Sequence, residues 1–302
     1  MNRRTFARNF AGGALGAAAL SQLSTAQEPA APSVPFQLSV MLWTVFRGLP
    51  FEDRLQKVSD AGYSHVELVG EFRNWSDADY QRVNQKKRAL GMTFDATSGI
   101  KPLLADPAQR EVFLGQVRDI LPTLDKLECP ALIVLAGNRI PGTPGYVQYQ
   151  SCVDGLKAAA EIVEGKNIRI LLENIDPHEN PRYFLTSVAE GFEVIRAVNH
   201  PQIKFLYDFY HEQIAEGNLI DKLEKNIDEV GLVHIADVPG RHEPGTGEIN
   251  YGNIFKKLAA LQYRHFAAME YLPTAGTDPV ESLRAAREYA RRSAASAGQA
   301  KA

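Results

Sequence analysis

Four polar side chains that can bind a metal ion close four short apolar segments in the second half of the chain. They are Glu173 after ILL, Asp208 after FLY, His234 after LV and Glu270 after AAM. Three carboxylates held together repel one another and resist ionisation unless a cation compensates them. A set of carboxylate and imidazole groups without thiolate suits Mn²⁺, Mg²⁺ or Co²⁺ better than a structural zinc ion. The pattern therefore predicts a divalent metal site, although each carboxylate taken singly could instead pair with a neighbouring Lys or Arg.

These side chains meet only if the four segments are adjacent strands that end at the same face. Along the chain, short β-branched or apolar runs alternate with longer amphipathic stretches, which is typical of repeated βα units. Strands are predicted over Leu38–Trp43, His65–Val69, Thr93–Ala96, Ala131–Ala136, Arg169–Glu173, Ile203–Asp208, Leu232–Ala236 and Phe266–Glu270. Helices are predicted over Phe51–Ala61, Asp77–Leu90, Glu111–Leu127, Cys152–Glu164, Val188–Val198, Leu219–Ile227, Ile254–Leu261 and Pro279–Arg292.

Eight strand and helix pairs fit a single (β/α)8 TIM barrel of the α/β class, whose active site lies at the C-terminal ends of the strands. An open, doubly wound sheet is the alternative. That fold usually carries a glycine-rich loop, GxGxxG, after its first strand, whereas the residues here are WTVFRG. We therefore predict a barrel domain over residues 36–295, followed by a frayed tail over 296–302.

The loop expected after the seventh strand carries the most specific motif. It reads GRHEP at 240–244 and GEINY at 247–251. Together with LLE at 171–173, YDFYH at 207–211 and MEY at 269–271, it resembles the hydroxypyruvate isomerase family of xylose-isomerase-like TIM barrels. The same superfamily contains the family 2 AP endonucleases. The resemblance extends over Leu38–Pro273, nearly the whole predicted domain.

The resemblance implies a role for seven residues. The metal ligands would be Glu173, Asp208, His234 and Glu270, of which Glu173 and Glu270 would also be the catalytic proton-transfer residues. The substrate-binding residues would be His211, Arg241 and Glu179. The chain departs from the pattern at His234, where hydroxypyruvate isomerases are expected to have glutamine and related epimerases histidine.

This set of residues suits proton transfer next to a carbonyl. The hydrogen on the neighbouring carbon is very weakly acidic, and a divalent ion that acts as a Lewis acid stabilises the enediolate left by its removal. One glutamate would take the proton and the other, or the same one, would return a proton to the adjacent carbon. We expect an isomerase that interconverts hydroxypyruvate and 2-hydroxy-3-oxopropanoate (tartronate semialdehyde), with Arg241 pairing with the substrate carboxylate.

Other functions remain open at this point. A keto-sugar 3-epimerase or an oxidised-sugar lyase would use the same metal and glutamate pair, and Arg241 could instead form a rim ion pair with Glu243 or Glu248. A binding module without catalysis would not need all four ligands. An abasic-site endonuclease of the same superfamily would need a histidine-rich zinc site and a basic surface for phosphates.

Composition limits the classes of molecule that the protein can be expected to bind. The 302 residues carry 33 Lys+Arg against 36 Asp+Glu, and 45% of them are hydrophobic. A net charge of -3 argues against nucleic acid as a partner, and we expect a small-molecule sugar or hydroxy-keto acid. Self-association into a homodimer is a weaker expectation. Two cysteines, Cys129 and Cys152, are too few for a disulfide framework, and we interpret both as packing residues.

The first 26 residues resemble an export signal. Arg3 and Arg4 begin a twin-arginine pattern, a weakly apolar Ala/Gly stretch follows, and no acidic residue precedes Glu28. Residues 27–35, with three prolines, are interpreted as a linker. We therefore expect the twin-arginine export machinery as a partner and a periplasmic location.

Overall fold

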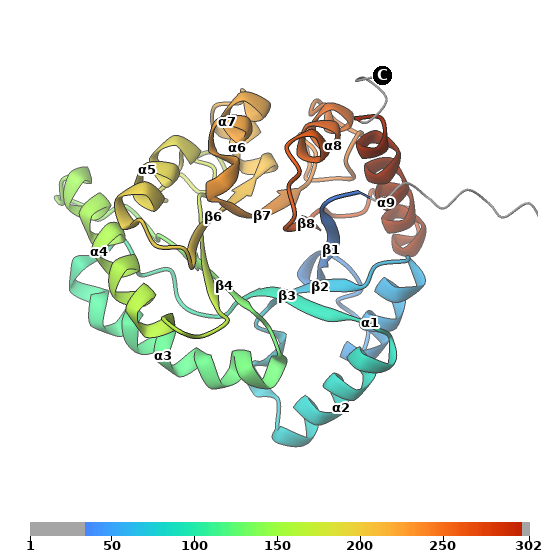
Figure 1. Cartoon of the computed structure of the whole chain (residues 1–302), viewed down its shortest axis with the longest axis horizontal. Coiled ribbons are helices and arrows are strands. Elements are labelled where there is room, and N and C mark those ends of the chain that lie inside the picture. The colour runs from blue at the N-terminus through green and yellow to red at the C-terminus, as the bar shows by residue number, and fades with distance from the viewer. Residues whose placement is uncertain (1–33, 298–302) are drawn as a thin grey trace, which may run out of the picture. The chain divides into compact units, whose positions relative to one another are not determined.

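The computed structural model describes residues 34–297, which form a closed barrel of eight parallel strands (Figure 1). Each strand pairs with its neighbour in sequence, and the eighth pairs with the first. The predicted TIM barrel is thus confirmed. The expected signal peptide, nearly all of the linker and the last five residues of the tail lie outside the described residues.

The strands are short and begin close to their predicted positions. Their bounds are β1 Gln37–Met41, β2 His65–Val69, β3 Thr93–Ser98, β4 Ala131–Leu135, β5 Arg169–Glu173, β6 Ile203–Asp208, β7 Val230–Ile235 and β8 Phe266–Met269. The helices surround the barrel in Figure 1. They are α1 Phe51–Asp60, α2 Asp77–Ala89, α3 Arg110–Leu127, α4 Gly145–Val163, α5 Val188–Val198, α6 Phe209–Ala215, α7 Leu219–Asn226, α8 Tyr251–Ala260 and α9 Pro279–Ala295.

Three elements differ from their predicted form. β1 ends at Met41 and passes into a 3-10 helix, Leu42–Thr44, which takes Trp43 out of the strand. α4 begins seven residues before the predicted start at Cys152. The first part of this helix lacks a clear apolar pattern, because Gln148 and Ser151 are buried through hydrogen bonds to backbone carbonyls. The short helix α6 was not predicted.

Buried apolar side chains fall into two groups. The smaller group lies along the strands and consists of Ala96, Ala131, Ile133, Leu171, Leu206, Leu232 and Ala268. The intervening strand residues belong to the larger group, which also contains the apolar faces of the helices. Since alternate residues of a strand point to opposite faces, the smaller group fills the inside of the barrel. The larger group joins the strands to the helices.

Smaller expectations can also be compared with the structure. Cys129 and Cys152 are free and buried, as expected of packing residues. His65 bonds Thr93, and His265 contacts Arg169, both away from the candidate ligands. Among the described residues, no helix is both long enough and apolar enough to cross a membrane.

Candidate metal centre and active site

Strand alternation places the four candidate ligands inside the mouth of the barrel. Each of them stands two residues beyond a member of the inner apolar group on its strand. The pairs are Leu171 and Glu173, Leu206 and Asp208, Leu232 and His234, and Ala268 and Glu270. A two-residue step keeps a side chain on the same face, so all four point inward. The register places Asp208 opposite His234 and His234 opposite Ala268.

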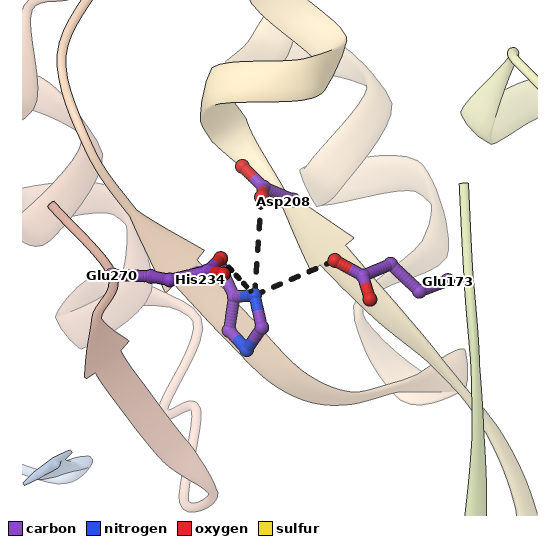
Figure 2. Close-up of side chains that lie close together, drawn as sticks. All are labelled: Glu173, Asp208, His234 and Glu270. Carbon is purple, nitrogen blue, oxygen red and sulfur yellow. Dashed lines mark ion pairs between the residues drawn. The ribbon is translucent and has the colours of Figure 1, made fainter. Parts of the chain in front are cut away.

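The four side chains converge on one point (Figure 2). One ligand atom from each lies within 4.8 Å of the others, and all four residues are buried. His234 Nδ1 is 2.7 Å from Glu270 Oε2, 3.5 Å from Glu173 Oε1 and 3.8 Å from Asp208 Oδ2. The structure therefore brings together the whole set that the sequence singled out.

The chemistry of this donor set fits a metal ion. His234 Nδ1 and Glu270 Oε2 are buried and lie 2.7 Å apart, but neither atom makes a hydrogen bond of good geometry. Buried polar atoms without partners are costly, and each costs less when it binds a ligand. Three carboxylates and one imidazole nitrogen are the ligands that a Mn²⁺, Mg²⁺ or Co²⁺ ion takes.

The two candidate proton-transfer glutamates differ in environment. Burial raises the pKa of Glu173, and the nearby charge of Glu270 adds to this, although His234 opposes it. Burial also opposes ionisation of Glu270, but Arg241 and His234 outweigh it and lower the pKa of Glu270 to about 2. Glu270 is held further by Trp43, whose Nε1 donates to Oε1 at 2.8 Å. Glu270 is thus the fixed carboxylate of the pair.

Charge compensation also acts on the other two ligands. Burial alone would raise the pKa of Asp208, but the charges of His211, His234 and Arg241 hold it well below its usual range. Burial alone would lower the pKa of His234, but the carboxylates of Glu67 and Glu270 raise it well above its ordinary value. The positive groups around the cluster thus favour the ionised forms of Asp208 and Glu270, whereas burial opposes ionisation of Glu173.

Asp208 also shapes the chain next to it. Its Oδ1 accepts hydrogen bonds from the backbone N–H groups of Tyr210 and His211, at 2.7 and 3.2 Å. Such a cap satisfies free donors at a helix start, which explains why α6 begins directly after β6. His211 lies in the first turn of α6, with Nε2 3.4 Å from Asp208 Oδ2. One carboxylate therefore positions a candidate substrate-binding residue.

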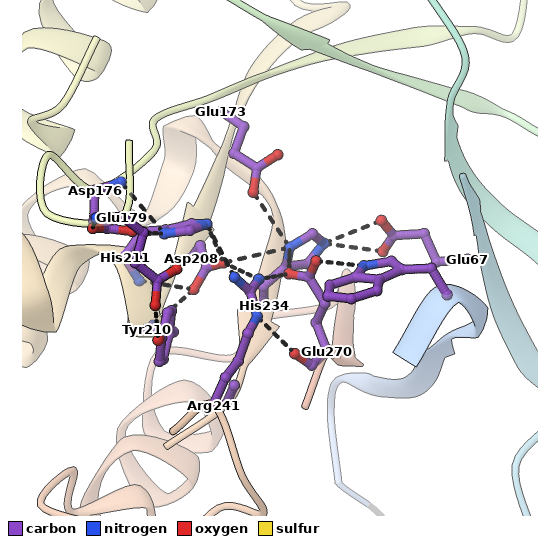
Figure 3. A network of polar contacts seen from close by, with 12 residues as sticks. Glu67, Glu173, Asp176, Glu179, Asp208, Tyr210, His211, His234, Arg241 and Glu270 are labelled. Atoms are coloured by element: carbon purple, nitrogen blue, oxygen red, sulfur yellow. Dashed lines mark hydrogen bonds and ion pairs between the residues drawn. The ribbon is translucent and has the colours of Figure 1, made fainter. Parts of the chain in front are cut away.

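Arg241 reaches the cluster from the loop after β7 (Figure 3). Its Nη2 lies 2.6 Å from Glu270 Oε2 and 3.3 Å from Asp208 Oδ2. Its guanidinium carbon lies 5.7 Å from the ring centre of Trp43 and 4.8 Å from that of Tyr210, within cation–π range. Arg241 therefore faces the site and is not a rim residue.

The other acidic residues of this loop have different partners. Glu243 accepts from Thr274 and Ser282, and Glu248 accepts from Gln213, so neither pairs with Arg241. Arg241 itself has a left-handed backbone, with φ 57°, a conformation that is uncommon for a residue with a side chain.

Glu179, the third candidate substrate-binding residue, lies in the loop after β5. It accepts a short hydrogen bond from the hydroxyl of Tyr210. The same loop supplies Asp176, whose Oδ2 lies 2.8 Å from His211 Nδ1. Glu179, His211 and Arg241 all line the same cavity as Glu173 and Glu270.

This cavity has a volume of about 440 Å³ and two unlike walls. β5–β8 and their loops supply the ionisable groups. β1–β4 and their loops supply a mainly apolar wall, which consists of Met41, Trp43, Val69, Ser98, Pro102, Ile133, Leu135, Gly137 and Asn138. A site with one charged and one mainly apolar wall suits a small polar molecule that carries carbon–hydrogen surface.

Comparison with known proteins identifies the family of this chain. A family model described as a xylose isomerase-like TIM barrel matches residues 55–293. The chain belongs to the xylose isomerase-like TIM barrel family. A 2-oxo-tetronate isomerase of Pectobacterium atrosepticum is 30% identical over 238 residues, covering 78% of this chain and 91% of that protein. The hydroxypyruvate isomerase of Escherichia coli is 27% identical over 250 residues, covering 80% and 95%. These names support the prediction that this family member is an isomerase.

Several solved structures share the fold of this chain. A family 2 AP endonuclease of Brucella melitensis has a TM-score of 0.76 and 25% identity, covering 84% of this chain and 98% of that chain. An Escherichia coli 3-keto-D-glucoside 4-epimerase has a TM-score of 0.71 and 20% identity, covering 85% and 99%. The IOLI protein, crystallised with a bound zinc atom, has a TM-score of 0.72 and 15% identity, covering 86% and 99%.

Several residues at this site were not predicted as functional candidates from the sequence. Glu67 contacts His234 from inside β2, and Asp176 contacts His211. Asp237 is fully buried and accepts from the backbone N–H groups of Gly245 and Ile249, which fixes the loop that carries Arg241. A charged residue between Val66 and Leu68 in an apolar strand was the available signal for Glu67.

Proposed function

We propose that the protein is a divalent-metal-dependent isomerase that interconverts hydroxypyruvate and 2-hydroxy-3-oxopropanoate through an enediolate. The observation that carries this proposal is the meeting of Glu173, Asp208, His234 and Glu270 beside the positive charge of Arg241. A metal ion held by the four ligands would act as a Lewis acid on the substrate carbonyl. The names of the curated relatives support this substrate class.

The glutamates carry the proton transfer in this mechanism. One removes a proton from C3 of hydroxypyruvate, and the electrons of the broken C–H bond form the C2–C3 double bond of the enediolate. A proton is then delivered to C2, and the hydroxyl proton passes from the oxygen on C3 to the oxygen on C2, so atoms and charge balance. We assign the removal to Glu173, since Glu270 is already held by Trp43 and Arg241.

Arg241 and His211 bind the rest of the substrate. Arg241 can exchange its contact with Asp208 for the substrate carboxylate, because guanidinium and carboxylate form strong charged hydrogen bonds. Nδ1 of His211 donates to Asp176, and the raised pKa of His211 favours the imidazolium form, whose Nε2 can donate to a substrate oxygen. Both residues thereby favour hydroxy-keto acids over neutral molecules.

A keto-sugar epimerase is the second candidate. Two observations favour it: histidine stands at position 234, and the cavity of about 440 Å³ is larger than a three-carbon acid needs. The same glutamates would then remove a proton on one face of the sugar and return one on the other. An oxidised-sugar lyase would differ only in losing a leaving group after proton removal.

Solvent exchange tests the shared chemistry. The Mn²⁺-loaded protein is incubated in D₂O with hydroxypyruvate, keto-hexoses and oxidised glycosides, and deuterium at the carbon next to the carbonyl is measured. We expect incorporation into hydroxypyruvate and its loss in Glu173→Gln and Glu270→Gln. Undiminished exchange in both variants would refute the mechanism. Exchange confined to a keto-hexose would favour the epimerase.

We also propose that residues 1–26 direct export by the twin-arginine route to the periplasm. Arg3 and Arg4, followed by a weakly apolar stretch, support this proposal. Fractionation of cells that express the full chain tests it. Replacing both arginines by lysine should retain the protein in the cytoplasm, and unchanged periplasmic recovery would count against the proposal.

A further inference from the structure

His234 is held from both sides of its ring. Nδ1 faces the three carboxylates of the candidate metal centre, whereas Nε2 lies 3.1 Å from each carboxylate oxygen of Glu67 (Figure 3). Glu67 comes from the opposite half of the barrel, in β2, where it is paired in register with Met41 of β1. A residue remote from the ligands in sequence therefore contacts one of them directly.

The contact has a defined polarity. An ionised carboxylate can only accept hydrogen bonds, so Nε2 of His234 must carry the hydrogen that Glu67 receives. The neighbouring carboxylates favour a second proton on the ring, and a metal ion that displaces this proton takes the lone pair of the other nitrogen. That nitrogen is Nδ1, the atom that points at Glu173, Asp208 and Glu270. The direction of this hydrogen bond thus decides which nitrogen is available to a metal ion.

The surroundings of Glu67 hold it in this role. Its side chain is fully buried, and His234 is 1% exposed. Among the described residues, His234 is the hydrogen-bond partner found for this carboxylate, and an unpaired buried carboxylate would be very costly. The neighbouring acidic residue, Asp95, is bonded to Ser39 instead, at 2.8 Å. Breaking the contact with Nε2 would leave the Glu67 carboxylate buried and unpaired, so the contact is strongly favoured.

We propose that Glu67 is a positioning residue that holds His234 in the Nε2–H form and presents Nδ1 to the metal ion. The inference rests on the metal centre of the proposed function. It goes beyond that function by assigning a task to a residue that touches neither the metal ion nor the substrate. Carboxylates that orient metal-binding histidines in this way typically change metal affinity by about 10- to 100-fold when removed.

Two variants separate the hydrogen bond from packing. Glu67→Gln keeps the size of the side chain, but its amide can either accept from Nε2 or donate to it, so it no longer dictates which nitrogen carries the hydrogen. Glu67→Leu removes the acceptor altogether. Glu212→Gln is the matched control, because Glu212 is also a fully buried carboxylate but pairs with Lys222.

Two measurements read out the effect without catalysis. Calorimetry with Mn²⁺ gives the Kd of each folded variant. In the zinc-loaded, diamagnetic protein, the ¹H–¹⁵N signal of His234 Nε2–H, assigned with His234→Asn, reports the hydrogen bond. We expect Mn²⁺ affinity to fall by about 10- to 100-fold in Glu67→Leu and by less in Glu67→Gln. The Nε2–H signal should be shifted or lost in Glu67→Leu, while Glu212→Gln leaves both readouts unchanged.

Each outcome has one meaning. Affinity within twofold of the original in both Glu67 variants, with an unchanged Nε2–H signal, would overturn the positioning role while leaving the metal centre intact. If Glu67→Leu does not fold, Glu67→Met takes its place, because it also removes the acceptor, and an unchanged Kd and signal in that variant would overturn the role. If the original protein binds no Mn²⁺, both this inference and the metal-dependent function fail. Weakened binding without substrate turnover would support the inference and refute only the function.

Discussion

Nη2 of Arg241 lies 2.6 Å from Oε2 of Glu270, so a permanent positive charge faces one of the two candidate proton-transfer glutamates. The same guanidinium lies within cation–π range of the rings of both Trp43 and Tyr210. Its position thus depends on stacking as well as on charge. Lysine could preserve the charge but neither the planar fork nor the stacking.

Arg241→Met should lower kcat/KM for an acid substrate by roughly 10- to 100-fold, because a charged hydrogen bond is worth about 1.5–3 kcal/mol. Arg241→Lys should recover only part of the loss. A neutral keto-hexose serves as the comparison in the same steady-state assay. An equal loss on acid and neutral substrates would show that Arg241 acts on the metal centre and not on a substrate carboxylate.

Removing divalent metal should lower the Tm. A ligand that binds only the folded state stabilises it by about 2.7 kcal/mol at a hundredfold excess over its Kd, and here the ion would also relieve repulsion among three buried carboxylates. Calorimetric scans with chelator, and after Mn²⁺ is restored, measure the change. The double variant Glu173→Gln, Glu270→Gln should lose this response. A chelator effect of the same size in that variant would place the ion elsewhere.

Two glycines should respond to alanine in opposite directions. A Cβ at Gly191 in α5 would lie 2.2 Å from the ring of Phe205 in β6, the strand that ends in Asp208. Gly191→Ala should therefore cost about 1–3 kcal/mol of unfolding free energy through overpacking. A Cβ at Gly115 in α3 meets nothing within 4 Å, so Gly115→Ala should add about 0.5–1 kcal/mol. Urea unfolding compares both, and stabilisation by Gly191→Ala would contradict the packing described.

Glu212 should make stability depend on pH. Burial raises its pKa from 4.5 to about 7, although Lys222 opposes this. Because the pKa is higher in the folded state than in the unfolded state, protonation of Glu212 stabilises the fold. This stabilisation is complete below the unfolded pKa and is lost as pH rises through the folded pKa. Between pH 4.5 and 8, Glu212→Gln should gain on the original protein by up to about 3 kcal/mol in urea unfolding. Glu111→Gln, on an exposed part of α3, is the control. If the free energy of unfolding of Glu212→Gln changed with pH in the same way as that of the original protein, the prediction would be contradicted.

The candidate ligands could be predicted because strand geometry is regular. Glu173, Asp208 and Glu270 each stand where an apolar strand ends, and a parallel barrel gathers such ends at one face. Nothing more than alternation and strand order was needed to bring them together with His234. Strands that follow one another in the sequence are also adjacent in the closed barrel, so their end residues lie close together.

Contacts across the barrel could not be predicted in the same way. Glu67 meets His234 only because β2 and β7 face each other through the interior, and a single sequence does not reveal the layer in which two such side chains meet. The start of α6 is not evident from the sequence, because Asp208 ends a strand as a candidate ligand and also caps the helix that follows. The hydrogen bond from Trp43 to Glu270 likewise joins residues 227 positions apart, and no sequence pattern signals it.

The two walls of the cavity bear on how this protein can change over evolutionary time. The groups for proton transfer stand on β5–β8, while the surface that shapes the bound molecule, including Met41, Val69 and Ile133, stands on β1–β4. Mutations in the first half of the gene can therefore alter which molecule is accepted and leave the reaction machinery encoded in the second half untouched. Glu67 and Trp43 are exceptions, since they contact His234 and Glu270 directly. New substrates are thus more accessible to this scaffold than new chemistry.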